Sequence, residues 1–252
     1  MVLFVIVRAR SIVAIRRIRI AETGVRFSPG PHLIYQVEVL VVILNNIMKG
    51  EVVAFIGAPG VGTSFLTRQM ACRNCNPSFL EGEEGIFTST ILSVLNNKID
   101  TPQRYDWLAE RTRLMLERAH AIAGIGITSY VDGDILLLEA WLNAEIGKQS
   151  PPILRKWIKA NSHLRADKVI VLTAPGQKIQ ENITRRGRIS EQSDFIQQRA
   201  QRIGQECRKL EGKHEHVRIL DRNNLEFTKT ETLDLVDNLI KQIPSLIYAK
   251  KY

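Results

Sequence analysis

Residues 57–64, with the sequence GAPGVGTS, have the types and the spacing of a loop that binds phosphate groups. The pattern G-x-x-x-x-G-K-[ST] is met by Gly57, Gly62 and Ser64, and Gly60 adds a further flexible position. Glycine has no Cβ, so the backbone can wrap closely around phosphate oxygens and point its N–H groups at them. Ser64 carries the hydroxyl that such loops place on a phosphate-bound Mg²⁺ ion. The residues expected to bind the phosphates are Gly57, Ala58, Pro59, Gly60, Val61, Gly62, Thr63 and Ser64.

One position of the loop departs from the pattern, because Thr63 stands where a lysine is expected. The lysine of such loops stabilises the charge that develops on a phosphoryl group during transfer. Phosphate binding does not depend on the lysine alone, since the N-terminus of the following helix also attracts anions. Three interpretations stay open: a loop that binds and transfers phosphate, a loop that binds a nucleotide without turnover, and a tight turn that binds nothing.

The elements around this loop alternate between strands and helices. Val52–Gly57 is a short, β-branched, apolar run, which is typical of a buried parallel strand. We predict strands at residues 52–57, 78–81, 125–132, 168–172 and 217–220, and helices at residues 64–72, 101–123, 135–146, 154–162, 177–186, 191–211 and 230–243. This alternation predicts an α/β fold with three layers, α/β/α, around a five-stranded, mostly parallel sheet.

With this loop and this order of elements, residues 50–243 resemble the P-loop nucleoside and nucleotide monophosphate kinases, most closely the deoxynucleoside kinase and thymidylate kinase group. The resemblance implies a P-loop NTPase fold, ATP and Mg²⁺ as cofactors, and phosphoryl transfer to a nucleoside, a nucleotide or a similar small molecule. Such kinases are often homodimers. The three cysteines suit a reducing compartment, so we expect a cytoplasmic protein. The GVGTS loop is similar, too, to that of some archaeal kinases for small phosphorylated acids, which keeps a phosphorylated metabolite open as the acceptor.

A cluster of arginines follows the fourth expected strand. Arg185, Arg186 and Arg188 lie within the segment KIQENITRRGRISE. In the kinases that the chain resembles, this segment is the mobile lid, whose arginines close over the phosphates. Guanidinium groups suit this task because they hold phosphate oxygens through two parallel hydrogen bonds. We expect these arginines to be catalytic and to supply the cation that Thr63 lacks; the alternative is an exposed basic helix end.

Carboxylates stand at the ends of two expected strands, where an open α/β sheet binds its ligands. Glu81 ends the second strand, and the resemblance makes it the base that activates the acceptor hydroxyl. Asp132 ends the third strand, where the family carries an Asp/Glu-Arg pair, although Gly133 replaces the arginine here. We expect Asp132 to be catalytic and to hold Mg²⁺ together with Ser64. Asp134 is an alternative ligand, but it is also a credible N-cap for the helix that follows.

The second expected helix walls the acceptor pocket in the kinases that the chain resembles. Its arginines, Arg111, Arg113 and Arg118, are candidates to contact an acceptor, and Tyr105 and Trp107 are candidates to stack on a base. An aromatic core with a solvated, charged outer face explains the same residues equally well.

The formal net charge of +9 is unevenly spread along the 252 residues. Residues 1–47 hold six arginines and two glutamates, a net of +4, which leaves +5 for the rest of the chain. Residues 23–33 (TGVRFSPGPHL) resemble the translated tail of a transfer-RNA gene, so we expect residues 1–47 to be an extension and translation to start at Met48. Residues 48–252 would then form one kinase-like domain. The alternative is a disordered leader or an organelle presequence.

The charge and the cysteines exclude several other classes of protein. The positive charge outside the extension includes the arginine cluster, which favours a nucleotide over a nucleic acid as the partner. The apolar runs are too short to span a membrane. Three cysteines do not make a disulfide framework, and a zinc site built from Cys72, Cys75, Cys207, His214 and His216 is a minor alternative. No hydrolase or zinc-protease motif occurs.

Overall fold

The computed structural model of the chain describes residues 50–80, 101–145, 152–186 and 194–246. The chain divides into two units, residues 1–49 and 50–252, and all of the described residues belong to the second unit. Glu81 and Arg188 lie outside the described residues.

Five strands form a single sheet in this part of the chain. They are β1 (Val52–Gly57), β2 (Ser78–Phe79), β3 (Ser129–Asp132), β4 (Lys168–Thr173) and β5 (Val217–Asp221), in the order β2-β3-β1-β4-β5. Every neighbouring pair is parallel. The central strand β1 is buried along its whole length, as its apolar sequence predicts. The predicted five-stranded sheet is confirmed, and its pairing is parallel throughout.

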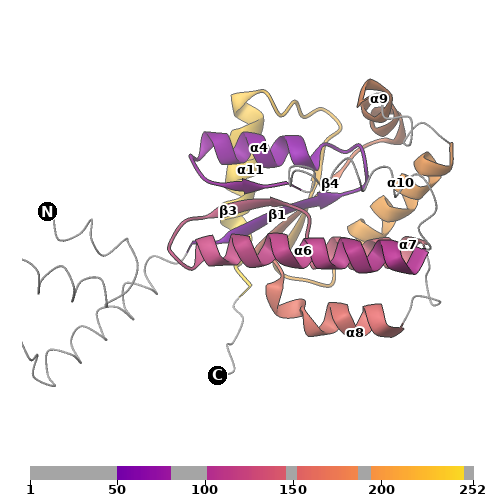
Figure 1. The fold of residues 1–252 in the computed structure, drawn as a ribbon. Helices are drawn as coiled ribbons and strands as arrows, with labels where there is room; N and C mark the ends of the chain where they lie inside the picture. Colours follow the sequence, from indigo (N-terminus) through magenta and orange to yellow (C-terminus); the bar gives the residue numbers. More distant parts are fainter. Residues whose placement is uncertain (1–49, 81–100, 146–151, 187–193, 247–252) are drawn as a thin grey trace, which may run out of the picture. The chain divides into compact units, whose positions relative to one another are not determined.

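Helices cover both faces of the sheet. They are α4 (Thr63–Arg73), α6 (Thr101–Ala123), α7 (Ile135–Glu145), α8 (Pro152–Ala160), α9 (Gly176–Arg186), α10 (Asp194–Arg208) and α11 (Thr230–Gln242), with a short 3₁₀ helix, η2, at Ser162–Leu164. Figure 1 shows α4 and α11 on one face of the sheet and α6 and α7 on the other, with α8 lying outside α6. α10 packs against α7, β1 and β4. The predicted three-layer α/β/α arrangement is confirmed.

Two of the predicted strands are shorter than expected. β3 begins at Ser129 instead of residue 125, because the chain first makes a turn in which Gly126 has a φ of 88° and its N–H donates to Ala123 O at 3.0 Å. Ile125 in this turn is 62% exposed. β2 ends at Phe79. The predicted strand was too long because the turn before β3 is apolar, although its residues do not pair with the sheet.

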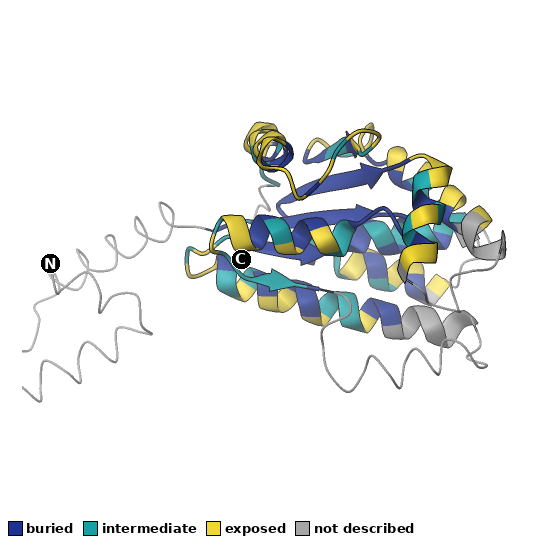
Figure 2. Ribbon diagram, turned by 90° about the horizontal axis from the view of Figure 1, so that it is seen from above, coloured by how far each residue is buried: buried dark blue, intermediate teal, exposed yellow. Residues whose placement is uncertain are grey.

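The core lies between the sheet and its helices, and Figure 2 shows the buried strands enclosed by helices whose outer faces are exposed. α6 matches the prediction at both ends, and most other helix bounds lie within two residues of the predicted ones. α10 ends at Arg208, three residues before the predicted end. Among the described helices, none is both long and apolar enough to cross a bilayer. The carboxyl ends of β1, β3 and β4 meet at one edge of the sheet, and the glycine-rich loop starts from that edge.

Candidate functional site

The glycine-rich loop leaves β1 at Gly57 and enters α4 at Thr63. Gly60 and Gly62 have φ values of 90° and 98°, in the left-handed region that glycine adopts without strain. Gly62 is the N-cap of α4, and no side chain caps this helix start. The first-turn N–H groups of α4 are therefore open to an anion, which the partial positive charge of a helix N-terminus favours.

Neighbouring elements press closely against the loop. A Cβ at Gly57 would lie 2.7 Å from Leu172 O in β4, and a Cβ at Gly60 would lie 2.9 Å from Ile183 Cγ1 in α9. Asn182, also in α9, donates from Nδ2 to Gly60 O at 2.7 Å. Strand β4 and helix α9 therefore hold the loop in one conformation, and larger side chains would disturb it.

Ser64 and Asp132 meet beside this loop. Ser64 lies in the first turn of α4, and its Oγ donates a hydrogen bond to Asp132 Oδ2. Asp132 is the last residue of β3, pairs in register with Phe55 of β1, and is only 6% exposed. A hydroxyl and a carboxylate in contact are hard oxygen ligands of the kind that Mg²⁺ takes, with water and substrate phosphates completing its coordination. The two residues expected to hold the metal are thus side by side.

Asp134 caps the start of α7, which the sequence analysis named as the alternative to metal binding. Its Oδ1 accepts the N–H of Leu136 at 2.8 Å, and its Oδ2 accepts the N–H of Ala166 at 2.7 Å. Burial raises the pKa of Asp134 to about 6, while the two backbone N–H groups and the nearby Arg165 act in the opposite direction. Both carboxylate oxygens are therefore engaged in fixing the start of α7 to the segment before β4.

Arg222 is a site residue that the sequence analysis missed. It directly follows β5, and its Nη1 donates to Val61 O in the loop at 2.6 Å. Its Cζ lies 4.7 Å from the centre of the Phe227 ring, a cation–π contact, and a Cβ at Gly62 would lie 2.5 Å from Nη1. A permanent cation is thus packed on the loop whose lysine position holds Thr63. The sequence gives one weak signal of this contact, which is that an arginine directly follows the last strand.

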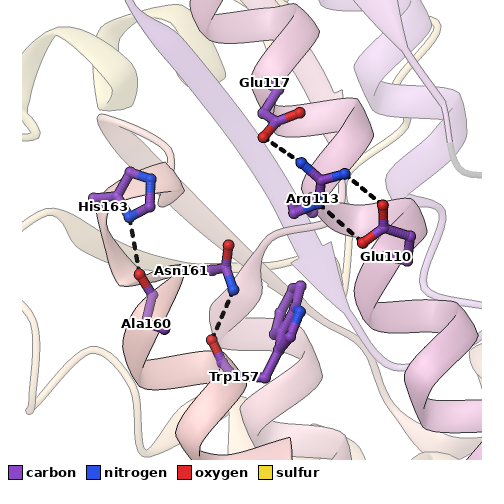
Figure 3. Close-up of polar contacts among 7 residues, drawn as sticks. All are labelled: Glu110, Arg113, Glu117, Trp157, Ala160, Asn161 and His163. Carbon is purple, nitrogen blue, oxygen red and sulfur yellow. Dashed lines mark hydrogen bonds and ion pairs between the residues drawn. The ribbon is translucent and has the colours of Figure 1, made fainter.

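A pocket opens next to Asp132, between α6 and α7. Counting space open to solvent, it has a volume of about 420 Å³. Its lining residues are Leu108, Arg111, Thr112, Met115, Asp132, Gly133, Asp134, Leu137, Leu138 and Trp141. Of the three arginines named on this helix, Arg111 lines the pocket. Figure 3 shows instead that Arg113 binds the carboxylates of Glu110 and Glu117, one turn away on its own helix. Arg118 is exposed.

Other candidates from the sequence are placed only in part. Arg185 is exposed in the last turn of α9, the helix that packs on the loop. For Arg186, Tyr105 and Trp107 the backbone alone is described. Glu81 and Arg188 lie outside the described ranges, so their expected roles stay predictions.

The cysteines and histidines of the zinc alternative do not form a metal centre in the described part of the chain. Cys72 and Cys75 are exposed and Cys207 is buried, and no group of three or more His, Cys, Asp or Glu ligands gathers among these residues. His214 and His216 lie together, with ring centroids 5.6 Å apart. Burial, then the neighbouring His214 and Arg165, lower the pKa of His216 to about 4. His216 is therefore a neutral histidine of the fold at ordinary pH.

Structures of nucleoside and nucleotide kinases share this fold. Deoxyadenosine kinase from M. mycoides is 14% identical with a TM-score of 0.58, over 76% of this chain and 100% of that one. Thymidylate kinase from Candida albicans is 14% identical with a TM-score of 0.56, over 77% of this chain and 92% of that one. Thymidylate kinase from Ehrlichia chaffeensis is 10% identical with a TM-score of 0.54, over 75% and 98%. No family model and no curated protein sequence matches the chain. The chain has the fold of the P-loop nucleoside and nucleotide kinases.

Proposed function

We propose that this protein is an ATP-dependent phosphotransferase that acts on a nucleoside, a nucleotide or a similar small molecule. The observation that carries the proposal is the hydrogen bond between Ser64 and Asp132, at the entry of α4 and beside the glycine-rich loop. It brings the two groups that would bind Mg²⁺ to the place where the loop would bind phosphates. The kinase fold of the structural neighbours supports the same function.

In this proposal the loop binds the phosphates of ATP. The backbone N–H groups of residues 57–64 and the N-terminus of α4 would contact the phosphate oxygens. Ser64 and Asp132 would hold Mg²⁺, which neutralises phosphate charge and polarises the transferred group when it is bound. Asp134, with both oxygens engaged by backbone N–H groups, keeps a structural role.

Arg222 and the lid arginines would supply the positive charge that Thr63 does not. Arg222 acts as a positioning residue, because its guanidinium group holds the carbonyl of Val61 and packs over Gly62, where the loop turns into α4. Arg185, Arg186 and Arg188 would close over the phosphates from the end of α9. Charge from two directions would stabilise the transferring phosphoryl group without the loop lysine.

The pocket beside Asp132 is the proposed acceptor site. Its apolar walls, including Leu137 and Trp141, suit a flat ring such as a nucleobase, and Arg111 supplies a cation for an acidic group. Glu81 is proposed as the base that takes the proton of the acceptor hydroxyl. An acceptor that carries a phosphate would use Arg111 in the same way, so a small phosphorylated acid is the second candidate.

The test is transfer of the γ-phosphate of labelled ATP by the purified protein with Mg²⁺. The acceptors to screen are nucleosides, nucleotides and small phosphorylated acids, and the matched control is Asp132→Asn. Labelled product that forms with the parent protein and not with the control supports the proposal. Saturable ATP binding without transfer to any acceptor would instead favour a nucleotide-binding regulator. Absence of ATP binding would overturn both functions.

The compartment and assembly are part of the same proposal. We propose that the protein works in the cytoplasm, in keeping with three cysteines and no disulfide framework. A homodimer is the assembly expected from the resemblance, and light scattering of the purified protein would distinguish it from a monomer.

A further inference from the structure

Helix α4 ends in a four-residue turn that has a cysteine at each end, Cys72 and Cys75. Both cysteines are exposed, and the proposed phosphotransferase uses neither of them. The third cysteine of the chain, Cys207, is buried in α10. The end of α4 is therefore the place where cysteine chemistry is open to solvent in this chain.

Backbone hydrogen bonds limit the distance between the two exposed cysteines. The N–H of Cys75 donates to Cys72 O at 3.3 Å, and the N–H of Asn76 donates to Ala71 O at 2.9 Å, which is the pattern of a Schellman motif. A hydrogen bond between the first and fourth residues of a turn keeps their Cα atoms within about 7 Å of each other. Disulfides join Cα atoms that are about 4.4–6.8 Å apart. The backbone thus has the span that a disulfide between Cys72 and Cys75 needs.

Cys75 has a backbone conformation that is unusual for a cysteine. Its φ is 52°, and among the residues that the structure describes no other residue except glycine has a positive φ. Glycine is the usual residue at this left-handed position after a helix, because a Cβ is unfavourable there. A glycine would therefore form the same turn with less strain. The geometry of the turn does not by itself explain why a cysteine stands at this position.

The two residues between the cysteines anchor the turn to neighbouring elements. Arg73 forms an ion pair with Asp234 and donates from Nη1 to Thr230 O at 3.4 Å. Both partners belong to α11, which lies on the same face of the sheet as α4 (Figure 1). Asn74 donates from Nδ2 to the hydroxyl oxygen of Tyr130 in β3 at 2.7 Å. The middle of the turn is thus held by two other elements, while the thiols at both of its ends stay exposed.

We propose that Cys72 and Cys75 are a reversible dithiol–disulfide pair, which a small disulfide oxidises and a small thiol reduces. The thiolate of one cysteine attacks a sulfur of the small disulfide, which forms a mixed disulfide and releases one small thiol. The thiolate of the other cysteine then attacks the protein sulfur of the mixed disulfide and expels the second small thiol. The pair loses two electrons and two protons, and the small disulfide gains them. In a reducing compartment the pair rests as two thiols.

Equilibration of the full chain with reduced and oxidised glutathione tests this pair. After acid quenching and alkylation of the remaining thiols, trypsin cleaves after Arg73, so the disulfide links peptides 69–73 and 74–98 and mass spectrometry detects the link. Closure consumes one oxidised glutathione molecule and releases two reduced ones. At a fixed ratio of the two forms, diluting total glutathione about tenfold should therefore raise the ratio of disulfide to dithiol by the same factor. A mixed disulfide with glutathione would not respond to this dilution.

Arg68→Cys/Cys72→Ser is the matched control, because it keeps two exposed thiols but moves one of them a helical turn, about 5.4 Å, further from Cys75. Each thiol of this variant should carry its own glutathione, with no internal disulfide. Cys207→Ala, checked by thermal unfolding, should close its disulfide as the parent does. Unreacted thiols in excess oxidised glutathione, oxidation that does not respond to dilution, or equal closure in the matched control would overturn the pair. None of these measurements uses ATP, so the result does not depend on the proposed phosphotransferase.

Discussion

Ser64 Oγ donates a hydrogen bond to Asp132 Oδ2 and so joins the first turn of α4 to the last residue of β3. The two residues are 68 positions apart in the sequence. Their contact depends on β3 lying next to β1, because β1 carries the loop that leads into α4. This buried carboxylate with its hydroxyl partner is the contact on which the proposed metal–phosphate site depends.

Asp132→Asn should lower the rate of phosphoryl transfer by about two orders of magnitude, because a bound metal ion contributes several kcal/mol to such reactions. The measurement is the transfer rate at saturating ATP over a range of Mg²⁺ concentrations, and the variant should need more Mg²⁺. Asp234→Asn is the control, since Asp234 is an exposed aspartate that pairs with Arg73 at the surface. A variant at position 132 with the parent rate and Mg²⁺ dependence would remove Asp132 from the metal site.

Gly62→Ala should destabilise the fold by about 1–2 kcal/mol, the usual cost of placing a side chain in the left-handed region. The added Cβ would also meet Arg222 Nη1 at 2.5 Å, so the guanidinium group must move. Urea unfolding measures the loss of stability, and ATP titration measures the damage to the loop. The control is Gly212→Ala, because a Cβ at Gly212 has no neighbour within 4 Å. Equal stability of the two variants would contradict the loop geometry.

Arg222→Gln should weaken ATP binding about tenfold, because hydrogen bonds from charged groups contribute roughly 1.5–3 kcal/mol. The lost contact is the one from Nη1 to Val61 O. Arg218→Gln removes the same charge four positions earlier, within β5, where the guanidinium group contacts Glu215 O and Val217 O instead. ATP affinity should remain close to that of the parent in this control.

The role of Arg222 can also be tested by restoring the lysine of the usual loop pattern. Thr63→Lys, introduced into Arg222→Gln, should recover part of the transfer rate, because the new ammonium group lies in the loop itself. A merely structural role of Arg222 would not respond to a lysine at position 63. No recovery, in a double variant that still binds ATP, would mean that Arg222 does not compensate for the missing lysine.

Arg111→Gln should raise the KM for the acceptor about tenfold and change the KM for ATP little, since Arg111 lines the pocket beside Asp132. Arg113→Gln is the matched control on the same helix. Its guanidinium group pairs with Glu110 and Glu117 at an exposed position, where ion pairs contribute little. If both variants changed the acceptor KM equally, the pocket would not be the acceptor site.

The stability that His216 contributes should rise with pH between about 4 and 6.5. Burial lowers the pKa of His216 from 6.5 to about 4, so in this window the unfolded chain binds a proton that the folded chain excludes. Proton binding to the unfolded state favours unfolding, and this penalty disappears as the pH rises through 6.5. The measurement is the free energy of unfolding of the parent minus that of His216→Phe at several pH values. A difference independent of pH would contradict the lowered pKa.

Asp134 supplies a control of opposite sign. Its pKa is raised by burial to about 6, so between about pH 4 and pH 6 the folded chain holds a proton that the unfolded chain has released. The free energy of unfolding of the parent minus that of Asp134→Asn should therefore fall as the pH rises through this window. A pH effect common to the whole protein would give both differences the same sign.

Much of the fold is readable from local patterns. The β-branched run at Val52–Gly57 predicts a buried strand, and the glycines after it predict a turn into a helix, because both features depend on residues that are close in sequence. The same reasoning located all five strands, and it failed at residues 125–128, where apolar residues form an exposed turn. Residue types alone do not distinguish a strand from a turn that places isoleucines in solvent.

The candidate site depends on contacts between distant parts of the chain. The residue types at Gly57, Gly62 and Ser64 were enough to predict phosphate binding, since the loop is a continuous segment. Local sequence patterns do not predict the hydrogen bond from Arg222 to Val61, because the two residues are 161 positions apart. They also do not predict that Arg111, and not Arg113, lines the pocket. Strand order brings the end of β5 to the loop, and the packing of α6 decides which of its arginines lines the pocket beside Asp132. Thr63 marks the missing lysine in the sequence, whereas only the folded chain shows that Arg222 contacts the same loop at Val61.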